Sequence, residues 1–492
     1  MERLSLLKLN EYIINIEKAK ELDNKAFVIN KIPPSLLMEE AATLIYERLK
    51  RNFNLSSHKI ALIAGSGNNG GDGLAVARKI FFNDGIKIDI FIFENRNESE
   101  LFKLQKDILK TLDFNFINVE KLKDLIGNYT LIIDAIFGIG YKYRDDILID
   151  EIFSVLNNSN TTIVAIDIPS GLNSDNRKMI KSDLTYSIGF LKEELFNINS
   201  RKYCGIIENI KISFDINNIN LEKNYYIDIN SYKFENKKNN FVNKYSKGSA
   251  LFIGGSSGKA GSIIFSALSA LRSGSGISLV LTNKGDIPLL NSISPEVVID
   301  SIENIDHYLD KYSTIAVGPG LSISQETMNI LKNIFYINKQ FILDASFFSN
   351  FDISILNEFS KPPILTPHTG EFKRFFGNYY DSLCKKTVLT VREICKKFNI
   401  YLILKDVDII IGTPKEEVIV IDNPNRLLST AGSGDILCGL ITGFISQGFS
   451  EIESILNAIK IFYTIGNFYL KNNYISYRIT DFIDKISYWE DL

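Results

Sequence analysis

The segment STAGSGDILCGL, residues 429–440, combines two glycines, a carboxylate and the start of an apolar helix. Glycine permits a tight turn with positive φ, so that backbone amides can approach a phosphate closely. A helix that begins at Asp435 would direct its free N–H groups and its partial positive charge to the same point. Asp435 would then accept the proton of a hydroxyl that attacks a phosphoryl group. The pattern predicts phosphoryl transfer to an alcohol.

A second glycine-rich turn, GSGNNGGDG, occupies residues 65–73 and follows the apolar run 59–64. Its first six residues match G-x-G-x-x-G, a dinucleotide-binding pattern that is weak evidence by itself. Asn68 and Asn69 add amide oxygens and donors inside a nest of backbone N–H groups. Such a nest suits a pyrophosphate beside a bound cation.

Two more turns in the same half place carboxylates at expected strand ends. Asp134 lies in DAIFGIG, and Asp167 lies in IDIPSG. Either aspartate alone would be explained by the capping of a loop. Because the carboxyl ends of parallel strands meet at one edge of a sheet, the three turns together predict a shared crevice.

The elements that must position these turns follow from an alternation of apolar β-rich runs and helical patterns. The expected strands are 59–64, 86–93, 130–134, 161–167, 249–254, 278–282, 314–318, 341–345 and 402–405. The alternation predicts α/β sheets with sites at the carboxyl ends of their strands. An Asn- and Lys-rich stretch, 217–241, lacks a helical period and marks a domain boundary near residue 235.

Composition limits the class of protein. A chain of 492 residues predicts two or more domains. Its 45% hydrophobic and 23% charged residues are typical of globular proteins, and the net charge of −3 argues against a general binder of nucleic acid or membrane surfaces. No secretory pattern or spanning apolar stretch is recognised. Four scattered cysteines without a C-x-x-C pair predict reduced thiols in the cytoplasm.

The three N-terminal turns together resemble the NAD(P)H-hydrate epimerase family, over roughly residues 10–215. Residues 19–42, AKELDNKAFVINKIPPSLLMEEAA, are similar to that family's opening helix, although Glu40 and Ala42 stand where Asn and Gly are usual. The resemblance implies a Rossmann-like, three-layer α/β/α domain. It also implies that the hydrated nucleotide binds to Asn68, Asn69, Gly70, Gly71, Asp72, Gly138, Ile139, Gly140, Tyr141, Lys142, Tyr143 and Arg144.

The same resemblance implies a potassium site and an acid–base group. Asn69, Asp134 and Ser170 would hold K⁺, for which hard oxygen ligands are suitable. Asp167 would contact the hydrated nicotinamide ring and epimerise its C6. Lys192 lies in SIGFLKEEL, near a lysine of the family, but an exposed lysine is the simpler interpretation.

Further turns in the C-terminal half indicate one more site. The turn GGSSGKAG, residues 254–261, is not a P-loop because Ile253 occupies the first glycine position and Ala260 follows the lysine. Gly320 ends the turn VGPG, and His368 precedes a helix in TPHTGEF. Of the three histidines, only His368 lies in such a context.

In order and spacing, ALFIGGSSGKAGS, SPEV, AVGPGL, ILTPHTGEFKRFFG and STAGSGDILCGL resemble the ADP/ATP-dependent NAD(P)H-hydrate dehydratase family, which is ribokinase-like. The likeness covers roughly residues 240–475. It implies that Ser262, Gly320, His368 and Asp435 contact the hydrated nucleotide. The phosphate donor, which brings Mg²⁺, would be bound by Lys405, Asp406, Val407, Asp408, Ile409 and Gly434.

Two stretches depart from that family. Asp344-Ala-Ser-Phe-Phe348 replaces the usual Asp-Ala-Asp-Ala-Leu, and Lys405-Asp-Val407 replaces Lys-Gly-Ala. Ser262 stands where alanine is usual. A carboxylate at Asp406 would weaken ADP binding unless it points away from the nucleotide.

The two resemblances imply one bifunctional repair enzyme, with an epimerase domain (1–218), a linker (219–238) and a dehydratase domain (239–492). It would interconvert the R and S epimers of NADHX or NADPHX and dehydrate the S epimer at the expense of ADP or ATP. Its relatives imply a homo-oligomer. The alternatives are a ribokinase-like small-molecule kinase, a dehydrogenase that uses GSGNNG with Glu94, and a non-catalytic nucleotide-binding protein.

Overall fold

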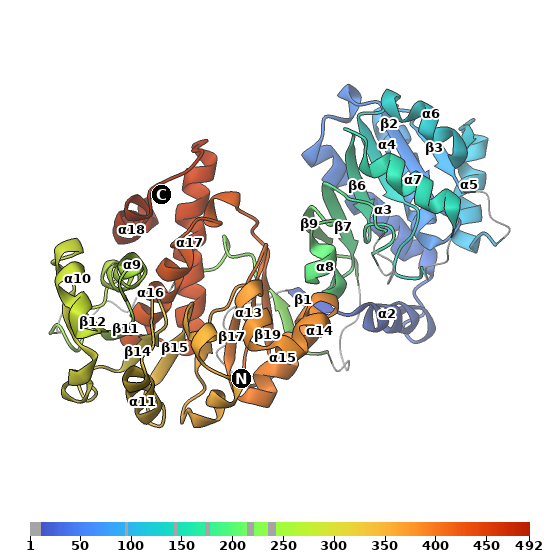
Figure 1. Cartoon of the computed structure of the whole chain (residues 1–492). Helices are drawn as coiled ribbons and strands as arrows, with labels where there is room; N and C mark the ends of the chain where they lie inside the picture. The colour runs from blue at the N-terminus through green and yellow to red at the C-terminus, as the bar shows by residue number, and fades with distance from the viewer. Residues whose placement is uncertain (1–10, 94–96, 142–145, 173–177, 214–220, 235–242) are drawn as a thin grey trace. The chain divides into compact units, whose positions relative to one another are not determined.

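The computed structural model describes residues 11–93, 97–141, 146–172, 178–213, 221–234 and 243–492. Within these ranges the chain divides into two compact units. The N-terminal unit comprises residues 11–224 with 384–387, and the C-terminal unit comprises 225–383 and 388–492 (Figure 1). Both units are built on sheets of mainly parallel strands, which confirms the predicted α/β class.

The N-terminal unit contains a parallel sheet in the order β4-β3-β2-β5-β6-β7-β9. Its central strands are continuous apolar runs, such as IALIA in β2, because helices cover both faces. The bounds are β2 Ile60–Ala64, β3 Asp89–Ile92, β4 Phe116–Asn118, β5 Leu131–Ala135, β6 Thr162–Ile166, β7 Leu184–Ile188 and β9 Ile206–Ile210.

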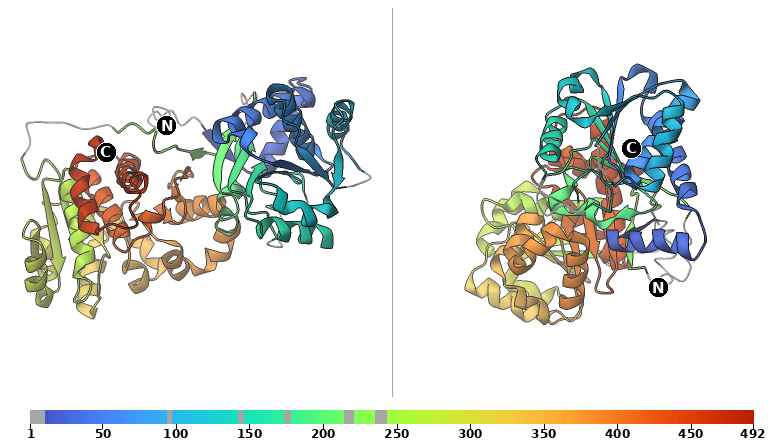
Figure 2. Two further views of the ribbon diagram at one scale, coloured as in Figure 1. Left: turned by 90° about the horizontal axis from the view of Figure 1, so that it is seen from above. Right: turned by 90° about the vertical axis from the view of Figure 1, so that its right-hand side faces the viewer.

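Two apolar clusters show the three layers of this unit. One joins Leu62 of β2 to the helices α3 (Pro34–Asn52), α4 (Asn68–Asp84) and α5 (Glu100–Thr111). The other joins Ile63, which points to the opposite face, to α6 (Leu122–Leu125) and α7 (Ile147–Asn157). Figures 1 and 2 show these helices on the two sides of the sheet.

Two glycines of GSGNNGGDG, Gly65 and Gly70, are required by close packing. A Cβ on Gly65 would lie 2.0 Å from the carbonyl oxygen of Ile136, and one on Gly70 would lie 1.8 Å from that of Gly65. Any side chain would therefore push α4 away from the ends of β2 and β5. These glycines place the start of α4 directly above the strand ends.

An N-terminal strand and helix complete the unit. β1 (Glu11–Ile14) pairs in parallel with β8 (Leu191–Lys192), with Ile14 opposite Lys192. Helix α2 (Ile16–Val28) follows at once, capped by Asn15, whose side chain accepts from the Lys18 amide at 2.8 Å. The strand pairing thus ties α2 to the segment that carries Lys192.

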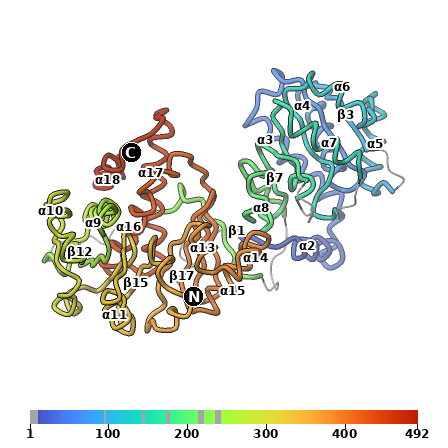
Figure 3. Tube along the Cα trace, in the orientation of Figure 1, coloured from blue at the N-terminus to red at the C-terminus, as the bar shows by residue number. Residues whose placement is uncertain are grey.

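The sheet of the C-terminal unit runs in the order β13-β12-β11-β14-β15-β16-β17, all parallel, and continues with antiparallel β18 and β19. The bounds are β11 Ser249–Ile253, β12 Ile277–Thr282, β13 Val298–Ser301, β14 Thr314–Val317, β15 Gln340–Leu343, β16 Ile364–Leu365, β17 Tyr401–Lys405, β18 Ile409–Gly412 and β19 Val418–Ile421. Figure 3 traces these strands in colours from green-yellow to orange.

Helices α9 (Ala260–Arg272), α16 (Ser433–Ser446) and α17 (Glu451–Lys471) carry much of the apolar core here. The first two pack with almost no space between them. A Cβ on Gly439 of α16 would lie 2.1 Å from the carbonyl oxygen of Ser266 on α9, and one on Gly443 would lie 2.9 Å from the Cα of Ala270.

The segment predicted as a linker, residues 219–238, contains structure in its described part. β10 (Asn224–Tyr226) lies beside β19, and the Ile227 amide donates to the Val420 carbonyl at 3.0 Å. Ile229 is also buried in the core. The alternating apolar residues of YYIDI explain this pairing. Among the described helices, none has the length and hydropathy needed to span a bilayer.

Candidate active sites

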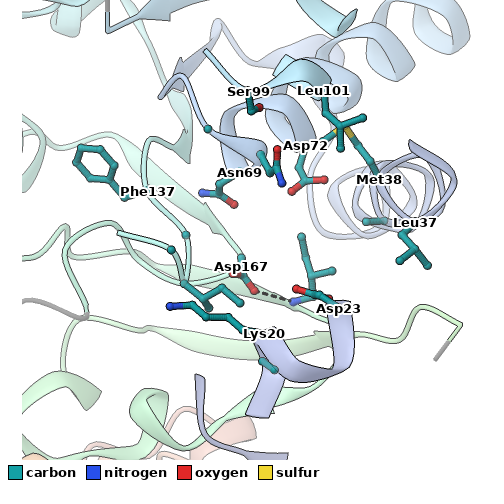
Figure 4. Close-up of a pocket in the computed structure, with 18 of the residues that line it drawn as sticks. Lys20, Asp23, Leu37, Met38, Asn69, Asp72, Ser99, Leu101, Phe137 and Asp167 are labelled. Atoms are coloured by element: carbon teal, nitrogen blue, oxygen red, sulfur yellow. Dashed lines mark hydrogen bonds between the residues drawn. The ribbon is translucent and has the colours of Figure 1, made fainter. Parts of the chain in front are cut away.

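A cavity of about 680 Å³ opens at the carboxyl ends of β2, β5 and β6, where the three predicted turns meet (Figure 4). The predicted residues on its wall are Asn68, Asn69, Asp72, Gly138, Ile139, Gly140, Tyr141 and Asp167. Gly70 and Gly71 are buried in α4 and do not line it. Lys142, Tyr143 and Arg144 lie outside the described residues.

Asp134 and Ser170 form a buried hydrogen-bonded pair under this cavity. Ser170 donates to Asp134 through its hydroxyl at 2.6 Å and through its amide at 2.9 Å. The Ile136 amide donates to the same carboxyl group at 3.2 Å. Burial raises the pKa of Asp134 to about 6, although these three bonds oppose the rise. The charged form therefore lacks a compensating positive charge.

Asn69 reaches the same region from the first turn of α4. Both polar atoms of its side chain are buried and have no hydrogen-bond partner among the described residues. Gly138 lies against it, since a Cβ there would be 3.2 Å from the Asn69 Cβ and 3.3 Å from Asp167 Oδ2. Buried amide groups are nearly always paired, so the Asn69 side chain is suited to a ligand.

Asp167 is held by a buried lysine. Lys192 Nζ donates to Asp167 Oδ1 at 2.6 Å, and the Lys192 side chain is 2% exposed. Asp167 has a φ of 69°, and its amide donates to the Tyr186 carbonyl at 2.8 Å. A left-handed aspartate at a strand end is uncommon and is typical of functional positions. The interpretation of Lys192 as an exposed lysine is wrong, because its side chain is buried with its ammonium on Asp167.

Helices α2 and α3 also contribute to the wall, which the sequence did not predict residue by residue. Lys20 and Asp23 come from α2, and Leu37 and Met38 come from α3. The likeness of residues 19–42 to an opening helix was the available signal. Of the two unusual residues there, Ala42 is in the core, and Glu40 accepts from the Ser213 hydroxyl at 2.9 Å.

In the C-terminal unit, a buried ion pair lies at the carboxyl ends of β15 and β17. Lys405 Nζ contacts Asp344 Oδ1 at 3.0 Å, and the Thr366 hydroxyl donates to the same oxygen at 2.7 Å. Burial lowers the pKa of Lys405, but the charges of Asp344 and Glu371 outweigh it and keep the pKa raised. The lysine is a fixed positive charge at physiological pH.

Asp435 lies beside this pair on α16. The helix begins at Ser433, two residues before the predicted start, because Gly432 takes a left-handed φ of 92° and caps it. Burial, followed by the charge of Asp344, raises the pKa of Asp435 to about 7, while a hydrogen bond from Ser262 opposes the rise. A carboxyl group with this pKa can accept a proton near neutral pH.

The amides near Asp435 only partly follow the prediction. The amide of Ser433 donates to the Thr430 carbonyl at 3.1 Å and is unavailable to a ligand. Within the described residues, the amides of Gly432, Gly434 and Asp435 have no backbone partner, so these three are open donors at the helix start. A Cβ on Gly434 would lie 3.2 Å from Lys405 Nζ, so glycine allows the lysine to approach the same point.

His368 caps α13 (Thr369–Phe375). Its Nδ1 accepts from the Gly370 amide at 3.0 Å, and its own amide donates to Glu371 Oε2 at 2.9 Å. Burial and the charge of Lys405 lower the pKa of His368, which keeps the ring neutral. Burial and the charge of Asp344 raise the pKa of Glu371 to about 7.

Gly320 closes a tight contact between two loops. It has a φ of 63°, and a Cβ there would lie 2.4 Å from the Lys259 carbonyl oxygen. The Ser256 hydroxyl donates to the Gly320 carbonyl at 2.6 Å. Ser262 lies in the first turn of α9, directly after the first of these loops.

The predicted nucleotide strand is divided between exposed and buried residues. Asp408 and Ile409 are buried, whereas Asp406 and Val407 are exposed. The Asp406 carboxylate accepts from the Val407 amide at 2.7 Å. This bond holds the charge within its own turn, at the solvent-exposed end of the strand.

Comparison with known proteins agrees with this arrangement. The model of the YjeF-related protein N-terminus matches residues 35–194, and that of NAD(P)H-hydrate dehydratase matches residues 250–488. The bifunctional NAD(P)H-hydrate repair enzyme of Dictyoglomus turgidum is 33% identical over 93% of this chain and 92% of its own length. The chain belongs to the family of bifunctional NAD(P)H-hydrate repair enzymes.

A second repair enzyme of this family, from Helicobacter pylori, is 27% identical over 96% of this chain and 98% of its own length. Among solved structures, the ADP/ATP-dependent NAD(P)H-hydrate dehydratase of Bacillus subtilis, co-crystallised with ATP and Mg²⁺, is 25% identical. It covers 52% of this chain and 93% of its own chain, with a TM-score of 0.46. Membership of the repair-enzyme family argues against the alternatives of a dehydrogenase and of a small-molecule kinase.

Replacement of Lys192 by methionine should destabilise the N-terminal unit. The substitution leaves the Asp167 carboxylate without its cation, which typically costs about 3–5 kcal/mol for a buried pair. The loss of stability is measured by chemical unfolding of the full chain, with hydrogen exchange at the β7 and β9 amides as the readout for the N-terminal unit. The double variant Lys192→Met/Asp167→Asn should recover part of it.

The matched control is Lys59→Met, since Lys59 is 61% exposed and contacts Asp89 at the surface. It should change the stability by less than about 1 kcal/mol. Equal effects of the two lysine substitutions would contradict the structural importance of the Asp167–Lys192 pair.

Proposed function

We propose that the C-terminal unit dehydrates the S epimer of NADHX or NADPHX after phosphorylating it, and that the N-terminal unit interconverts the R and S epimers. The observation that carries the proposal is Asp435, a carboxyl group of pKa about 7 at the open start of α16, beside Lys405. Family membership supplies the substrate class.

Dehydration requires a better leaving group than hydroxide. Asp435 accepts the proton of the C6 hydroxyl as its oxygen attacks the terminal phosphoryl group of the donor nucleotide. The amides of Gly434 and Asp435 and the ammonium of Lys405 stabilise the charge of the migrating group. The C6–O bond then breaks, phosphate leaves with the bonding electrons, and loss of a C5 proton restores the double bond.

The other predicted contacts have assignable roles in this mechanism. Gly320 and His368 bind the hydrated nucleotide, and Ser262 orients Asp435. The donor lies along Lys405 to Ile409 and at Gly434, with Asp406 directed to solvent. Mg²⁺ accompanies the donor and supplies charge neutralisation at its phosphates. We favour ADP as the donor, by resemblance to bacterial repair enzymes of this architecture.

In the N-terminal unit, Asp167 contacts the hydrated ring and is the acid–base group that epimerises C6. Lys192 Nζ donates to Asp167 Oδ1 at 2.6 Å and holds this carboxyl group in place to act as a base. The residues 68–72 and 138–144 surround the nucleotide. The homo-oligomer and the cytoplasmic location predicted from the sequence stay predictions.

We further propose that Asn69, Asp134 and Ser170 hold K⁺. Two observations support this: the unpartnered buried amide of Asn69, and the buried Asp134 carboxyl group, which has three donors but no cation. All three side chains offer oxygen atoms, as a hard monovalent cation requires. The bound ion would supply the positive charge that the buried carboxylate lacks.

Replacement of single aspartates should separate the two activities. Asp435→Asn should lower NADH formation from S-NADHX by about 10²–10⁴-fold and leave the R–S interconversion unchanged, because it removes only the base. Asp167→Asn should have the reverse effect. NADH absorbance with ADP and Mg²⁺ measures the first activity, and chromatography of the epimers without nucleotide measures the second.

The control for both is Asp481→Asn, which should leave both rates unchanged, because this carboxylate is 40% exposed and paired with Arg478. Nucleotide binding by the wild-type protein without NADH formation from either ADP or ATP would favour the non-catalytic alternative. Full dehydration by Asp435→Asn would contradict the proposed base.

The rate of dehydration should depend on one ionisation near pH 7. The base must be unprotonated, so kcat/KM for S-NADHX should fall about tenfold per unit as pH decreases below about 7 and level off above it. Initial rates with saturating ADP and Mg²⁺ between about pH 5.5 and about pH 8.5 measure the profile. Enzyme incubated at each pH and assayed at neutral pH controls for unfolding. A flat profile would contradict the assignment.

Potassium should stabilise the N-terminal unit in a pH-dependent way. Asp134 is protonated in the folded protein below about pH 6, and this contribution to stability is lost as pH rises through that value. K⁺ binds the carboxylate, so KCl should raise the unfolding temperature more at about pH 7.5 than at about pH 5.5. Choline chloride at equal ionic strength is the control. An equal rise of the unfolding temperature with both salts, or an undiminished rise with KCl in Asp134→Asn, would contradict the proposed potassium site.

A further inference from the structure

Three carboxyl groups and one buried ammonium face the cavity of the N-terminal unit. Asp23 comes from α2, Asp72 from α4, Asp167 from the end of β6 and Lys192 from β8. Figure 4 shows Asp72 pointing into the cavity from one wall, with Asp23 and Asp167 on the facing side. The cavity therefore holds more carboxyl groups than its one buried ammonium can neutralise.

The cation serves only one of the three carboxyl groups. Lys192 Nζ donates to Asp167 Oδ1 at 2.6 Å, to the Ile188 carbonyl at 2.6 Å and to the Ser187 hydroxyl at 3.2 Å. An ammonium has three donors, and all three are used. Among the described residues, neither Asp23 nor Asp72 receives a hydrogen bond or ion pair, and Lys20 is the other cation on the wall.

Two unneutralised carboxyl groups near a third cannot all ionise easily. Burial, then the charges of Asp167 and Asp23, raises the pKa of Asp72 well above its usual value. Burial and the charge of Asp167 raise the pKa of Asp23 to about 6. Within the described residues, no group of three or more His, Cys, Asp or Glu side chains is arranged to hold a metal ion.

The pairing of β1 with β8 sets the position of Asp23. The register of β1 on β8 sets Ile14 opposite Lys192, and α2 begins two residues later. The Ile16 amide donates to Glu194 Oε1 at 3.2 Å, and Leu22, next to Asp23, is buried. The same strand pair thus fixes both the ammonium on Asp167 and the carboxyl group that faces Asp72.

We infer that Asp72 is the general acid of the epimerisation, and that Asp23 is the positioning residue whose charge keeps the proton on Asp72. This inference rests on the proposed epimerase function. Asp167 with Lys192 is then the base, and the two catalytic carboxyl groups lie on opposite walls of one cavity. Two carboxyl groups in different surroundings within one site commonly divide the acid and base roles.

The step balances without a further reactant. The Asp167 carboxylate takes the proton of the C6 hydroxyl, the C6–N1 bond breaks with its electron pair on N1, and Asp72 protonates N1. The product is a ring-opened C6 aldehyde and a neutral amine. After the aldehyde turns its other face, N1 adds to C6, Asp72 recovers its proton from N1, and Asp167 returns its proton to oxygen.

The test uses the full chain without ADP or ATP, starting from pure S-NADHX. Asp72→Asn should slow the appearance of the R epimer at least about 100-fold at every pH. The wild-type rate should fall on the alkaline side as Asp72 ionises. Asp23→Asn removes a negative charge, so this fall should move to lower pH by about one unit, whereas Asp23→Glu should leave it in place.

Two amide variants are matched controls on the same helices. Glu21→Gln on α2 and Asp84→Asn on α4 remove carboxylates that pair with Lys18 and Lys50 outside the cavity. Both should retain the wild-type rate and pH profile. Retention of an ¹⁸O label at C6 during epimerisation supports ring opening, and its complete exchange with water overturns that step.

The outcomes separate this inference from the proposed function. A wild-type protein that does not accelerate interconversion overturns both. A wild-type protein that is active while Asp72→Asn matches it overturns the general acid alone. An unmoved alkaline limb in Asp23→Asn, with wild-type thermal stability, overturns the role of Asp23.

Discussion

The loss of water around carboxyl groups at the ends of parallel strands is the constraint on which both sites depend. Parallel strands end together, and the helices that cover their faces leave little solvent at that edge. Asp134 follows this rule in the N-terminal unit, and Asp344 follows it in the C-terminal unit. A carboxylate in such a place must find a cation, share hydrogen bonds or keep its proton. The two units use these solutions in different combinations.

In the C-terminal unit the solution is a lysine. Lys405 forms an ion pair with Asp344. Burial, followed by the charge of Asp344, raises the pKa of Asp435 to about 7. In the N-terminal unit Lys192 satisfies Asp167, while Asp134 relies on hydrogen bonds from Ser170 and Ile136. In the C-terminal unit, the proposed base is thus the carboxyl group that the local cation leaves incompletely compensated.

Much of the fold was readable from the chain. Nine apolar runs predicted strands, and each corresponds to a strand in the structure, because buried parallel strands have continuous apolar sequences. Weaker strands, such as β16 with two residues, carry no such signal. The sequence predicts a linker at β10, because its Asn- and Lys-rich neighbours hide a short alternation of apolar residues.

The motifs of the two candidate sites can be read from the sequence, but the residues that hold or face their carboxyl groups cannot. Asp435, Asp134 and Asp167 follow strand-end or helix-start patterns that local sequence reveals. Lys192 was misread because only the pairing of β1 with β8, 178 residues apart at Ile13 and Leu191, shows that it is buried. Asp23 had no local signal either, since its neighbours in the cavity come from distant parts of the chain. Contacts of this kind depend on tertiary structure.

The glycine-lined contact between α9 and α16 has a consequence for mutational robustness. Ser266 of α9 donates to the Asp435 carbonyl at 2.9 Å, and one turn later Gly439 lies against the Ser266 backbone. Ser262, which bonds the Asp435 side chain, lies one turn earlier on α9. The position of Asp435 therefore depends on the close packing of α9 against α16. Gly439 lies about 6 Å from Asp435 along the helix axis. A methyl group added there would separate the two helices and displace the proposed base, although the substitution lies inside the apolar core.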